Sequence, residues 1–499
     1  MELLQEALRS LFHLDNFVWM NIGLLIGVIF GAVPGMTVIL AIVLFLPFTY
    51  SLGPIQSFMF LLGIYCAGGY GGSISAILIH TPGTPHATAT MLDGYPLKEK
   101  GQAHKALNVA LQASTFGGLL SAVTLLFFAP QIAKFAERVG TPEYFLVCLF
   151  GLTIIAGVSG KSLLKGIIAC CFGLFIETIG IDPMAGSTRF IFNNINFYSG
   201  FDLVICLIGL FALSEILQKN KPEKQIQIKG LPNDKGKISA QEYKRMSLPA
   251  LISAIIGIAI GIIPGTGASE ASFFSYNIAK NMSKHPEEFG KGAIEGIAAP
   301  ETANNAVSGA TLIPLLTLGI PGDGAVAIMM GALMINGLTP GPKLFQDHGV
   351  VMYAIMLGLI FVNIFMFIQG KYLTALFAKV INIPVSILTP IIVMFCFAGS
   401  FSVNTSLFDI GTAIVFAVIA YILQRLDFPV IPILLGLVLG RLTEENFRRS
   451  LILSDGNWNV FISSPLCIFF IILIFIVLIL IWNTKIQDSK RIKKEAKNA

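Results

Sequence analysis

The chain has 499 residues, of which 55% are hydrophobic and 12% are charged, and its mean hydropathy is +0.78. Soluble domains carry about a quarter of charged residues, so this composition argues against a soluble protein. The net charge is +5. The seven cysteines lie in apolar runs without a CxxC pair, and this pattern argues against a zinc cluster or a disulfide framework. The sequence therefore predicts a polytopic membrane protein.

Apolar runs of roughly bilayer-spanning length follow one another along the chain, whereas a closed barrel would need short alternating segments. We therefore predict an all-α membrane protein with about twelve transmembrane segments. The opening sequence MELLQEALRSLFHLDNF has no basic region followed by a small-residue cleavage site, so we do not expect a cleaved signal peptide. The clearest apolar runs occupy residues 58–69, 119–133, 144–158, 203–217 and 465–482.

The order of polar and apolar stretches divides the chain into two membrane halves. We expect a first repeat at residues 1–217, a basic linker at 218–246, a second repeat at 247–459, an extra membrane helix at 460–484 and a basic tail at 485–499. The positive-inside rule puts the linker and the tail in the cytoplasm, and the amino terminus, which has no positive excess, in the periplasm. The first half would then cross the membrane an odd number of times, which makes the repeats inverted.

Three ordered matches between the halves indicate an internal repeat, and the last of them places GIDP at 180–183 opposite RLDFP at 425–429. The segment GVIFGAVPGM from Gly27 aligns with GIAIGIIPGT from Gly257, and TPGTPHATATMLDG from Thr81 aligns with IPGDGAVAIMMGALMING from Ile320. Small residues recur by chance in membrane helices, but matches in a preserved order favour a duplicated unit. Each half then carries two apolar segments interrupted by Pro-Gly, and paired interruptions of this kind point to the binding site of a secondary transporter.

A helix break inside a membrane is tolerated only where protein or a water-filled cavity satisfies the freed N–H and C=O groups. The N-terminus of a half-helix suits an anionic group, and the carbonyls at a C-terminal end suit Na⁺. Polar side chains near the breaks can complete either shell, although an isolated hydroxyl more often bonds its own helix backbone. These side chains are Ser73, Ser75, Thr81, Thr84 and Thr88 in the first half, and Asn304, Asn305, Ser308, Thr311 and Thr317 in the second.

Four motifs cover these breaks and their surroundings: YGGSISAILIHTPGTP, LDGYPLKEKGQAHKAL, IAAPETANNAVSGATLIPLLTLGIPG and ILLGLVLGRLTEENFRRSL. Over nearly its whole length the chain resembles the TctA family, the large membrane subunit of tripartite tricarboxylate transporters. The resemblance implies uptake of a tricarboxylate or related carboxylate across the bacterial inner membrane, driven by a Na⁺ or proton gradient. It also implies a TctB-like small membrane subunit and a TctC-like periplasmic substrate-binding protein. We expect no cofactor besides Na⁺ as coupling ion, and no nucleic-acid partner.

The resemblance also implies a substrate site between the two halves. Its residues would be Ser73, Ser75, Thr81, Gly83, Thr84, Asn304, Asn305, Ser308, Gly322 and Asp323. The turns PGMT and PGTG would lie close by, and we expect them to coordinate Na⁺ through Gly35, Thr37, Gly265, Thr266 and Gly267.

Two positions depart from the family pattern. His80 stands where asparagine is common, which opens a role for protonation beside a carboxylate. Asp323 stands where serine is frequent, so it either caps the following half-helix or helps to bind Na⁺ or a proton. Among the other ionisable residues, Glu301 is the strongest functional candidate, because intramembrane charge is costly and Glu301 precedes two asparagines in a weakly polar segment.

Other function classes find less support in the sequence. GVSGKSLL is similar to a phosphate loop, but Ile155 occupies the place of the first glycine, and there is no HExxH or GxSxG motif, so we expect no enzyme. A channel stays open as an alternative because broken helices also line pores, as does a carboxylate carrier that needs no binding protein. A purely structural subunit would leave the paired polar breaks without a reason. We favour a symporter with alternating access and, by analogy, an elevator-like motion.

Overall fold

The computed structural model describes residues 2–136, 138–158, 162–218 and 236–479. This part of the chain is mostly helical, and its only strands are β1 (Gly180–Ile181) and β2 (Thr188–Arg189), which pair antiparallel with Gly180 opposite Arg189. The predicted all-α class is confirmed. Most of the predicted basic linker and all of the predicted basic tail lie outside the described residues, as does part of GVSGKSLL.

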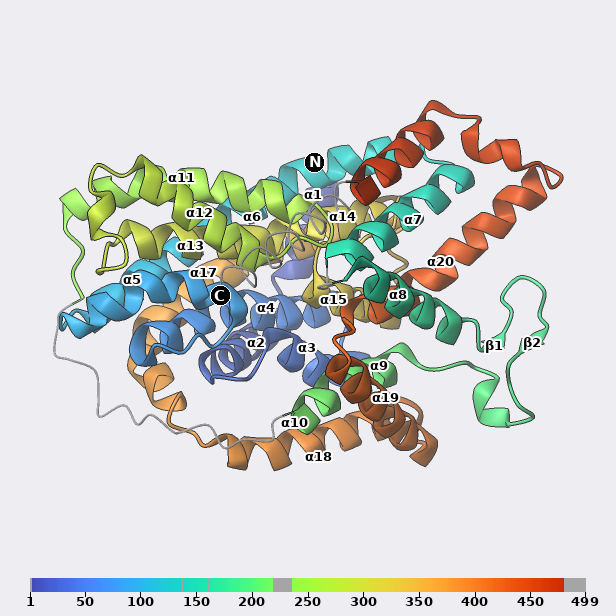
Figure 1. The fold of residues 1–499 in the computed structure, drawn as a ribbon, viewed down its shortest axis with the longest axis horizontal. Coiled ribbons are helices and arrows are strands. Elements are labelled where there is room, and N and C mark those ends of the chain that lie inside the picture. The colour runs from blue at the N-terminus through green and yellow to red at the C-terminus, as the bar shows by residue number, and fades with distance from the viewer. Residues whose placement is uncertain (1, 137, 159–161, 219–235, 480–499) are drawn as a thin grey trace, which may run out of the picture.

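The helices of the first half follow one another in the order shown in Figure 1. They are α1 (Glu2–Leu11), α2 (Leu14–Ala32), α3 (Val38–Phe45), α4 (Pro54–Ile79), α5 (Thr88–Glu99), α6 (Ala103–Ala136), α7 (Thr141–Val158), α8 (Leu163–Glu177), α9 (Leu203–Leu207) and α10 (Ser214–Gln218). Between them lie the 3₁₀ turns η1 (Leu46–Ser51), η2 (Pro85–Ala87) and η3 (Ile195–Phe197), and the π-helical stretch η4 (Ile208–Leu213).

The second half also contains long helices and shorter helical segments. They are α11 (Ala240–Ile262), α12 (Ala268–Met282), α13 (Glu295–Ala310), α14 (Leu312–Leu318), α15 (Gly324–Ile335), α16 (Leu344–Asp347), α17 (Gly349–Val380), α18 (Val385–Asn404), α19 (Leu407–Arg425) and α20 (Ile431–Leu453). The 3₁₀ turns η5 (Pro286–Glu288) and η6 (Trp458–Ile462) complete this half, and an apolar helix follows over Pro465–Ile479.

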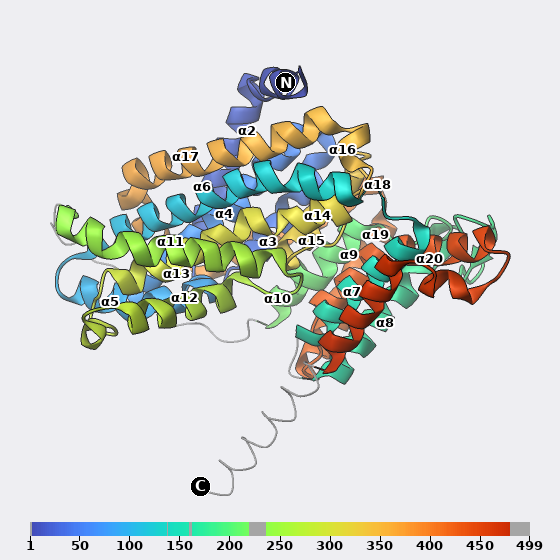
Figure 2. The same cartoon turned by 90° about the horizontal axis from the view of Figure 1, so that it is seen from above.

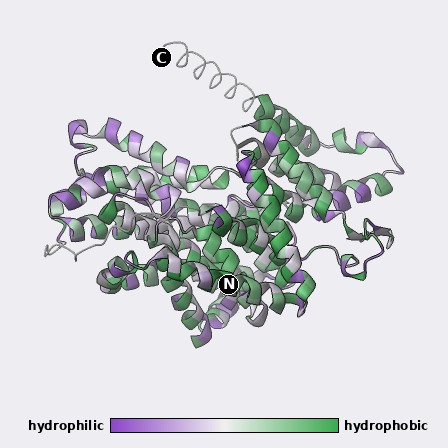
Figure 3. Cartoon of the chain, turned by 60° about the horizontal axis from the view of Figure 1, so that its bottom comes forward, coloured by the Kyte–Doolittle hydropathy of each residue, from purple (hydrophilic) through white to green (hydrophobic). Residues whose placement is uncertain are grey.

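Seven of the described helices are long and apolar enough to cross a membrane. Figure 3 shows hydrophobic residues along most helices and hydrophilic residues gathered near helix ends and loops. Large apolar side chains such as Phe127, Leu164 and Val415 are more than half exposed, as lipid-facing residues are. The chain is therefore a multi-pass membrane protein, while the number of about twelve segments stays a prediction. The seven helices are Leu14–Ala32, Pro54–Ile79, Ala103–Ala136, Ala240–Ile262, Gly349–Thr374, Ser386–Asn404 and Leu407–Arg425.

The long helices form two groups around a central region of half-helices. In Figures 1 and 2, α5, α11, α12 and α13 lie at one end of the molecule, and α7, α8 and α20 lie side by side at the other. Helix α4 packs against α2 and α17, and α13 packs against α6, α11 and α12. The half-helices α3 and α15 contact each other between these groups.

The first pair of predicted breaks is present at equivalent places in the two halves. Helix α2 ends before Pro34-Gly35 and α3 restarts after it, and α11 and α12 flank Pro264-Gly265 in the same way. Gly35 and Gly265 have φ values of 77° and 81°, a left-handed conformation that glycine adopts without a clash of a β-carbon. Both turns therefore depend on their glycines.

The second pair of predicted breaks is also present, after the ends of α4 and α14. Helix α4 ends at Ile79, and α14 ends at Leu318, and the residue after each end is left-handed, with φ of 56° at His80 and 70° at Gly319. The Pro-Gly pair follows each of these helix ends, and a new helical segment begins after it. All four predicted interruptions thus occur.

Glycines allow the helices next to the breaks to approach each other closely. A β-carbon on Gly27 of α2 would lie 2.5 Å from the carbonyl oxygen of Ile64 on α4. A β-carbon on Gly257 of α11, the residue aligned with Gly27, would lie 2.5 Å from the carbonyl oxygen of Ala303 on α13. Because lipid supplies no hydrophobic force between helices, this close backbone contact is how they associate.

The loop between α8 and α9, which holds β1 and β2, is fixed to α20. Arg448 Nη1 lies 2.6 Å from Asp182 Oδ2, and Arg189 Nη1 lies 2.8 Å from Glu444 Oε1. The backbone N–H of Ala185 and the guanidinium of Arg448 hold the pKa of Asp182 well below its usual value. A loop of the first half is thereby attached to a helix of the second.

Asp93 joins the halves at the opposite group of helices. Its fully buried carboxylate on α5 accepts hydrogen bonds from Tyr276 Oη on α12 and from the backbone N–H groups of Gly292 and Ala293, each at 2.8 Å. Backbone N–H groups only donate, so this site requires an acceptor. Asp93 therefore acts as a buried cap for the segment that leads into α13.

We expect Asp93→Ala to lower the free energy of unfolding by about 3 kcal/mol, because three buried donors lose their acceptor at about 1–3 kcal/mol each with partial relaxation. Thermal unfolding of the detergent-purified protein measures this as a lower midpoint. Asp347→Ala is the control, since the Asp347 side chain is exposed. Equal midpoints for the two variants would contradict the capping role.

Candidate functional site

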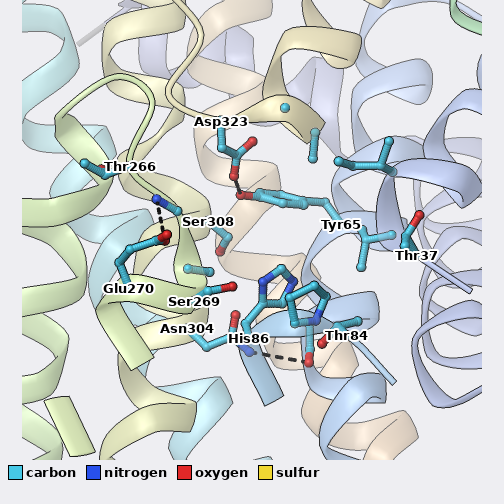
Figure 4. A pocket seen from close by; sticks show the side chains of 18 of the residues that line it. Thr37, Tyr65, Thr84, His86, Thr266, Ser269, Glu270, Asn304, Ser308 and Asp323 are labelled. Atoms are coloured by element: carbon cyan, nitrogen blue, oxygen red, sulfur yellow. Dashed lines mark hydrogen bonds between the residues drawn. The ribbon is translucent and has the colours of Figure 1, made fainter. Parts of the chain in front are cut away.

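The broken ends of both halves surround one cavity with a volume of about 370 Å³ (Figure 4). Residues at the starts of α3, α12 and α15 line it, together with η2, which leads into α5. The middle of α4, the middle of α13 and the first turns of α20 complete the wall. The positive ends of several helix dipoles are therefore directed to one small volume, an arrangement that favours an anion.

The starts of the half-helices carry their own caps. Thr37 Oγ1 accepts a hydrogen bond from the Leu40 N–H at 3.0 Å, and Asp323 Oδ1 accepts one from the Val326 N–H at 2.8 Å. Glu270 Oε2 accepts the Gly267 N–H at 3.1 Å. These caps satisfy part of each helix start, as is typical of Thr, Asp and Glu in the first turn.

Polar side chains of α13, and Thr84 just before η2, lie at the cavity with incomplete hydrogen bonding. Asn304 Nδ2 donates to the carbonyl oxygen of Gly69 at a long 3.4 Å. Asn305 Nδ2 and Thr84 Oγ1 are buried and have no hydrogen-bond partner. Leaving a buried polar atom unpaired is costly, so these two atoms are candidates for contact with a bound molecule.

Asp323 connects the second half to the first across the cavity. Its Oδ2 accepts a hydrogen bond of 2.5 Å from Tyr65 Oη on α4, while its Oδ1 caps α15. Figure 4 shows the Tyr65 ring extending across the cavity to this carboxylate. The capping role expected for Asp323 is present, and the same side chain also lines the cavity.

The charges of the cavity wall are unbalanced. Asp323 and Glu270 bring two carboxyl groups, and His86 brings an imidazole. None of the described residues that line the cavity is a lysine or an arginine. An anionic ligand must therefore rely on helix starts, amides and hydroxyls, or on a cation that enters with it.

Nine of the fifteen residues expected to bind substrate or Na⁺ line this cavity. Of the substrate set these are Thr84, Asn304, Asn305, Ser308 and Asp323, and of the Na⁺ set they are Thr37, Gly265, Thr266 and Gly267.

Three of the other expected residues turn their hydroxyls to nearby backbone. Ser73 Oγ donates to the carbonyl oxygen of Tyr70, Ser75 Oγ to that of Gly72 and Thr81 Oγ1 to that of Ile79. Isolated Ser and Thr residues in helices commonly do this. Their hydroxyls therefore do not belong to the cavity wall in this conformation.

The remaining expected residues, Gly35, Gly83 and Gly322, are packing and turn residues next to the cavity. A β-carbon on Gly83 would lie 1.9 Å from the carbonyl oxygen of Gly31, and one on Gly322 would lie 2.6 Å from Thr311 Cβ. The Gly322 carbonyl oxygen accepts the Gly265 N–H at 2.8 Å, which joins the two breaks of the second half. These glycines shape the site without lining it.

The structure adds cavity residues that the sequence reasoning did not assign to the site. Tyr65, Gly69, His86, Ser269 and Glu270 all line the cavity. Tyr65 and Gly69 lie far from a Pro-Gly pair in the sequence, and the sequence does not show which way a side chain points from its helix. His86 and Glu270 each lie within a few residues of a predicted break, and this was the signal that could have found them. His80, by contrast, is exposed and stacks on Tyr95 with ring centroids 4.5 Å apart.

A multi-pass membrane fold with a polar cavity where broken helices meet is typical of a membrane transport protein. The chain belongs to the family described as "Tripartite tricarboxylate transporter TctA family", which matches residues 17–435. It is therefore a tricarboxylate transporter component, from a family of transporters and not of enzymes. No solved structure gives a significant match.

Two relatives come from Agrobacterium vitis. An "Uncharacterized 52.8 kDa protein in TAR-I ttuC' 3'region" is 37% identical over 453 residues, which is 90% of each chain. An "Uncharacterized protein in TAR-II ttuC' 3'region" is 42% identical over 210 residues, which is 42% of this chain and 87% of that protein. The first relative thus supports the family membership over nearly the whole chain.

Gly69→Ala tests whether this cavity binds the ligand. The added β-carbon would lie 3.6 Å from Oδ1 of both Asn304 and Asn305, so it fits and narrows the space between the two amides. We expect citrate to bind about tenfold more weakly in Na⁺ buffer, measured by calorimetric titration of the purified protein. Gly411→Ala is the matched control, because the site in α19 is open. Unchanged affinity in Gly69→Ala would mean that the ligand binds elsewhere.

Proposed function

We propose that this chain is the membrane-embedded subunit of a binding-protein-dependent secondary transporter that imports tricarboxylates or related carboxylates across the bacterial inner membrane by Na⁺ symport. The observation that carries the proposal is the cavity between the halves, where half-helix starts meet buried amide and hydroxyl groups without partners. Membership in the TctA family supports the substrate class.

The substrate's carboxylates would lie against the helix starts and the polar side chains of α13. Asn305 Nδ2 and Thr84 Oγ1 have unused hydrogen-bonding capacity, and Asn304 Nδ2 has only a long bond. Helix N-termini stabilise anions through their dipoles and their N–H groups. Together they would supply a bound carboxylate with donors from both halves.

A coupling cation follows from the charge balance. A tricarboxylate that enters a cavity with two acidic side chains and no lysine or arginine adds negative charge to negative charge. Na⁺ at the turns of Thr37 or Gly265–Gly267, beside Asp323, would offset this repulsion. Substrate and cation would then bind together, which is the basis of symport.

Alternating access between inverted repeats is the motion we propose. The aligned glycines Gly35 and Gly265 have nearly the same φ, and the helix ends at His80 and Gly319 are both left-handed. The last segment of each half also packs on helices of the other half. Helix α20 packs on α7 and α8 of the first half, and η4, near the end of the first half, packs on α18 and α19 of the second. Such correspondence supports two related halves that move against each other, in an elevator-like manner.

The proposed partners are those of the tripartite systems. A TctB-like small membrane subunit would lie beside this chain in the lipid bilayer, and a TctC-like periplasmic protein would deliver the carboxylate. Family membership supports both. The alternatives are a channel and a carrier that needs no binding protein. The following experiment distinguishes both from the proposed transporter.

Reconstitution tests the proposal directly. We expect labelled citrate to enter proteoliposomes that hold this chain and its small subunit only when the binding protein and an inward Na⁺ gradient are both present. Concentrative uptake excludes a channel, and uptake without the binding protein or without Na⁺ would contradict the proposed mechanism.

The carboxylate of Asp323 provides a sharper test of Na⁺ coupling. Asn is also a good helix cap, so Asp323→Asn keeps the start of α15 while it removes a charge from the cavity. We expect the Na⁺ concentration for half-maximal uptake to rise about tenfold. Asp347→Asn, at an exposed position, should match the wild type. An unchanged Na⁺ dependence in Asp323→Asn would show that this carboxylate takes no part in cation binding.

A further inference from the structure

A second buried carboxyl group lies behind the cavity on the same helix. Glu301 is 0% exposed in α13, about one turn before Asn304 and Asn305 and two turns before Ser308. Residues three and four positions apart share a helix face, so Glu301, Asn305 and Ser308 form one polar stripe. Glu301 itself does not line the cavity.

Two hydroxyl groups hold the Glu301 carboxyl group. Thr90 Oγ1 on α5 lies 2.6 Å from Oε1, and Ser114 Oγ on α6 lies 2.7 Å from Oε2. No described lysine, arginine or histidine forms an ion pair with Glu301. A carboxylate at this depth without a cation is costly, so a site of this kind favours a carboxyl group that can become neutral.

The contrast with Asp93 on α5 is informative. Asp93 accepts two backbone N–H groups at Oδ1 and the Tyr276 hydroxyl at Oδ2, so Oδ1 must stay an acceptor, because a backbone N–H cannot accept a proton in return. A hydroxyl can donate to a carboxylate or accept from a carboxylic acid. The shell of Thr90 and Ser114 therefore stays hydrogen-bonded whether or not Glu301 carries a proton.

The geometry suits a proton better than a metal ion. The two oxygen–oxygen distances of 2.6 and 2.7 Å are direct hydrogen bonds, which leave no ion-sized gap between the groups. The described residues also contain no group of three or more His, Cys, Asp or Glu side chains that could hold a metal. A proton needs no such gap.

The elements packed around α13 bring few charged groups to Glu301. Two cations of α6 and α11 are engaged by other acids, since Lys105 pairs with Glu242, and Arg245 pairs with Glu288 and with Glu295 at the start of α13. Other titratable groups on the packed elements include the Tyr70 phenol on α4, which has no hydrogen-bond partner, Asp93 on α5, Tyr276 on α12 and His86 in η2. The same elements also carry Tyr65, Tyr95, Lys98, Glu99, His104, Lys134, Tyr243, Lys244, Glu270 and Lys280.

We propose that Glu301 binds and releases a proton during the transport cycle, an inference that rests on the proposed carrier function. Its carboxylate takes up one proton to become a carboxylic acid, and the hydroxyls of Thr90 and Ser114 turn to match each state. Thr90 follows the cavity residues Thr84 and His86 in the same segment, and Glu301 shares α13 with the cavity amides. Protonation thereby acts on the hydrogen bond that joins these two walls of the cavity.

Infrared difference spectra of the full-length protein in lipid test protonation without any substrate. Spectra taken on either side of neutral pH should show the C=O stretching band of a buried carboxylic acid that disappears on the alkaline side. Glu301→Gln should remove this band, and Glu301→Asp should keep a shifted one. A wild-type spectrum with no such pH-dependent band, or a band that persists in Glu301→Gln, overturns the proposal. Because no citrate is involved, this result is independent of the transport function.

The pH profile of citrate uptake tests whether the proton serves transport. The Na⁺ gradient and the binding protein are held constant. Above the pH at which half of the Glu301 side chains are protonated, the protonated fraction falls about tenfold for each pH unit, and wild-type uptake should fall with it. Glu301→Gln, a neutral isostere that keeps both hydrogen bonds, should lose this dependence while its thermal midpoint stays near that of the wild type. Citrate titrates alike in both proteins, so the comparison cancels its effect. The same pH profile in both proteins overturns a transport role for the Glu301 proton.

Discussion

Every interruption of a helix inside a membrane exposes backbone N–H and C=O groups that lipid cannot satisfy. This chain contains four such interruptions, and the rest of its architecture encloses them. Gly27 and Gly257 let α2 and α11 approach α4 and α13 to backbone contact, which closes the protein around the breaks. Thr37, Asp323 and Glu270 then satisfy part of the helix starts. The cavity lies where these four breaks come together.

The groups that meet at the breaks determine the electrostatic potential of the cavity. Helix starts give it positive potential without any lysine or arginine, and its carboxyl groups give it negative charge. An anion alone or a cation alone therefore meets groups of its own sign, whereas the two together are complementary. The Tyr65–Asp323 hydrogen bond crosses between the halves at this point, so a ligand that contacts Asp323 lies next to groups of both halves.

Three buried acids illustrate how surroundings assign different roles to one functional group. Asp93 receives two backbone donors and the Tyr276 phenol, and serves as a cap between the halves. Asp323 has one backbone donor and one phenol at the cavity wall, so a ligand can compete for part of its capacity. Glu301 has only hydroxyl partners, which accommodate either protonation state. The number of backbone donors, which is two, one and none, distinguishes them more than burial does.

The sequence by itself determined the helical membrane class, the four Pro-Gly breaks and the family resemblance, because hydropathy and helix interruption are local properties of the chain. It also pointed to Asn304, Asn305 and Asp323, which follow or precede a break on the cavity side. Only the tertiary structure decided which polar groups share the cavity: Ser73 and Ser75 bond their own helix, while Tyr65 and His86 line the wall. The rotation of each helix depends on contacts between residues far apart in sequence, such as Tyr65 with Asp323, and no local pattern records them.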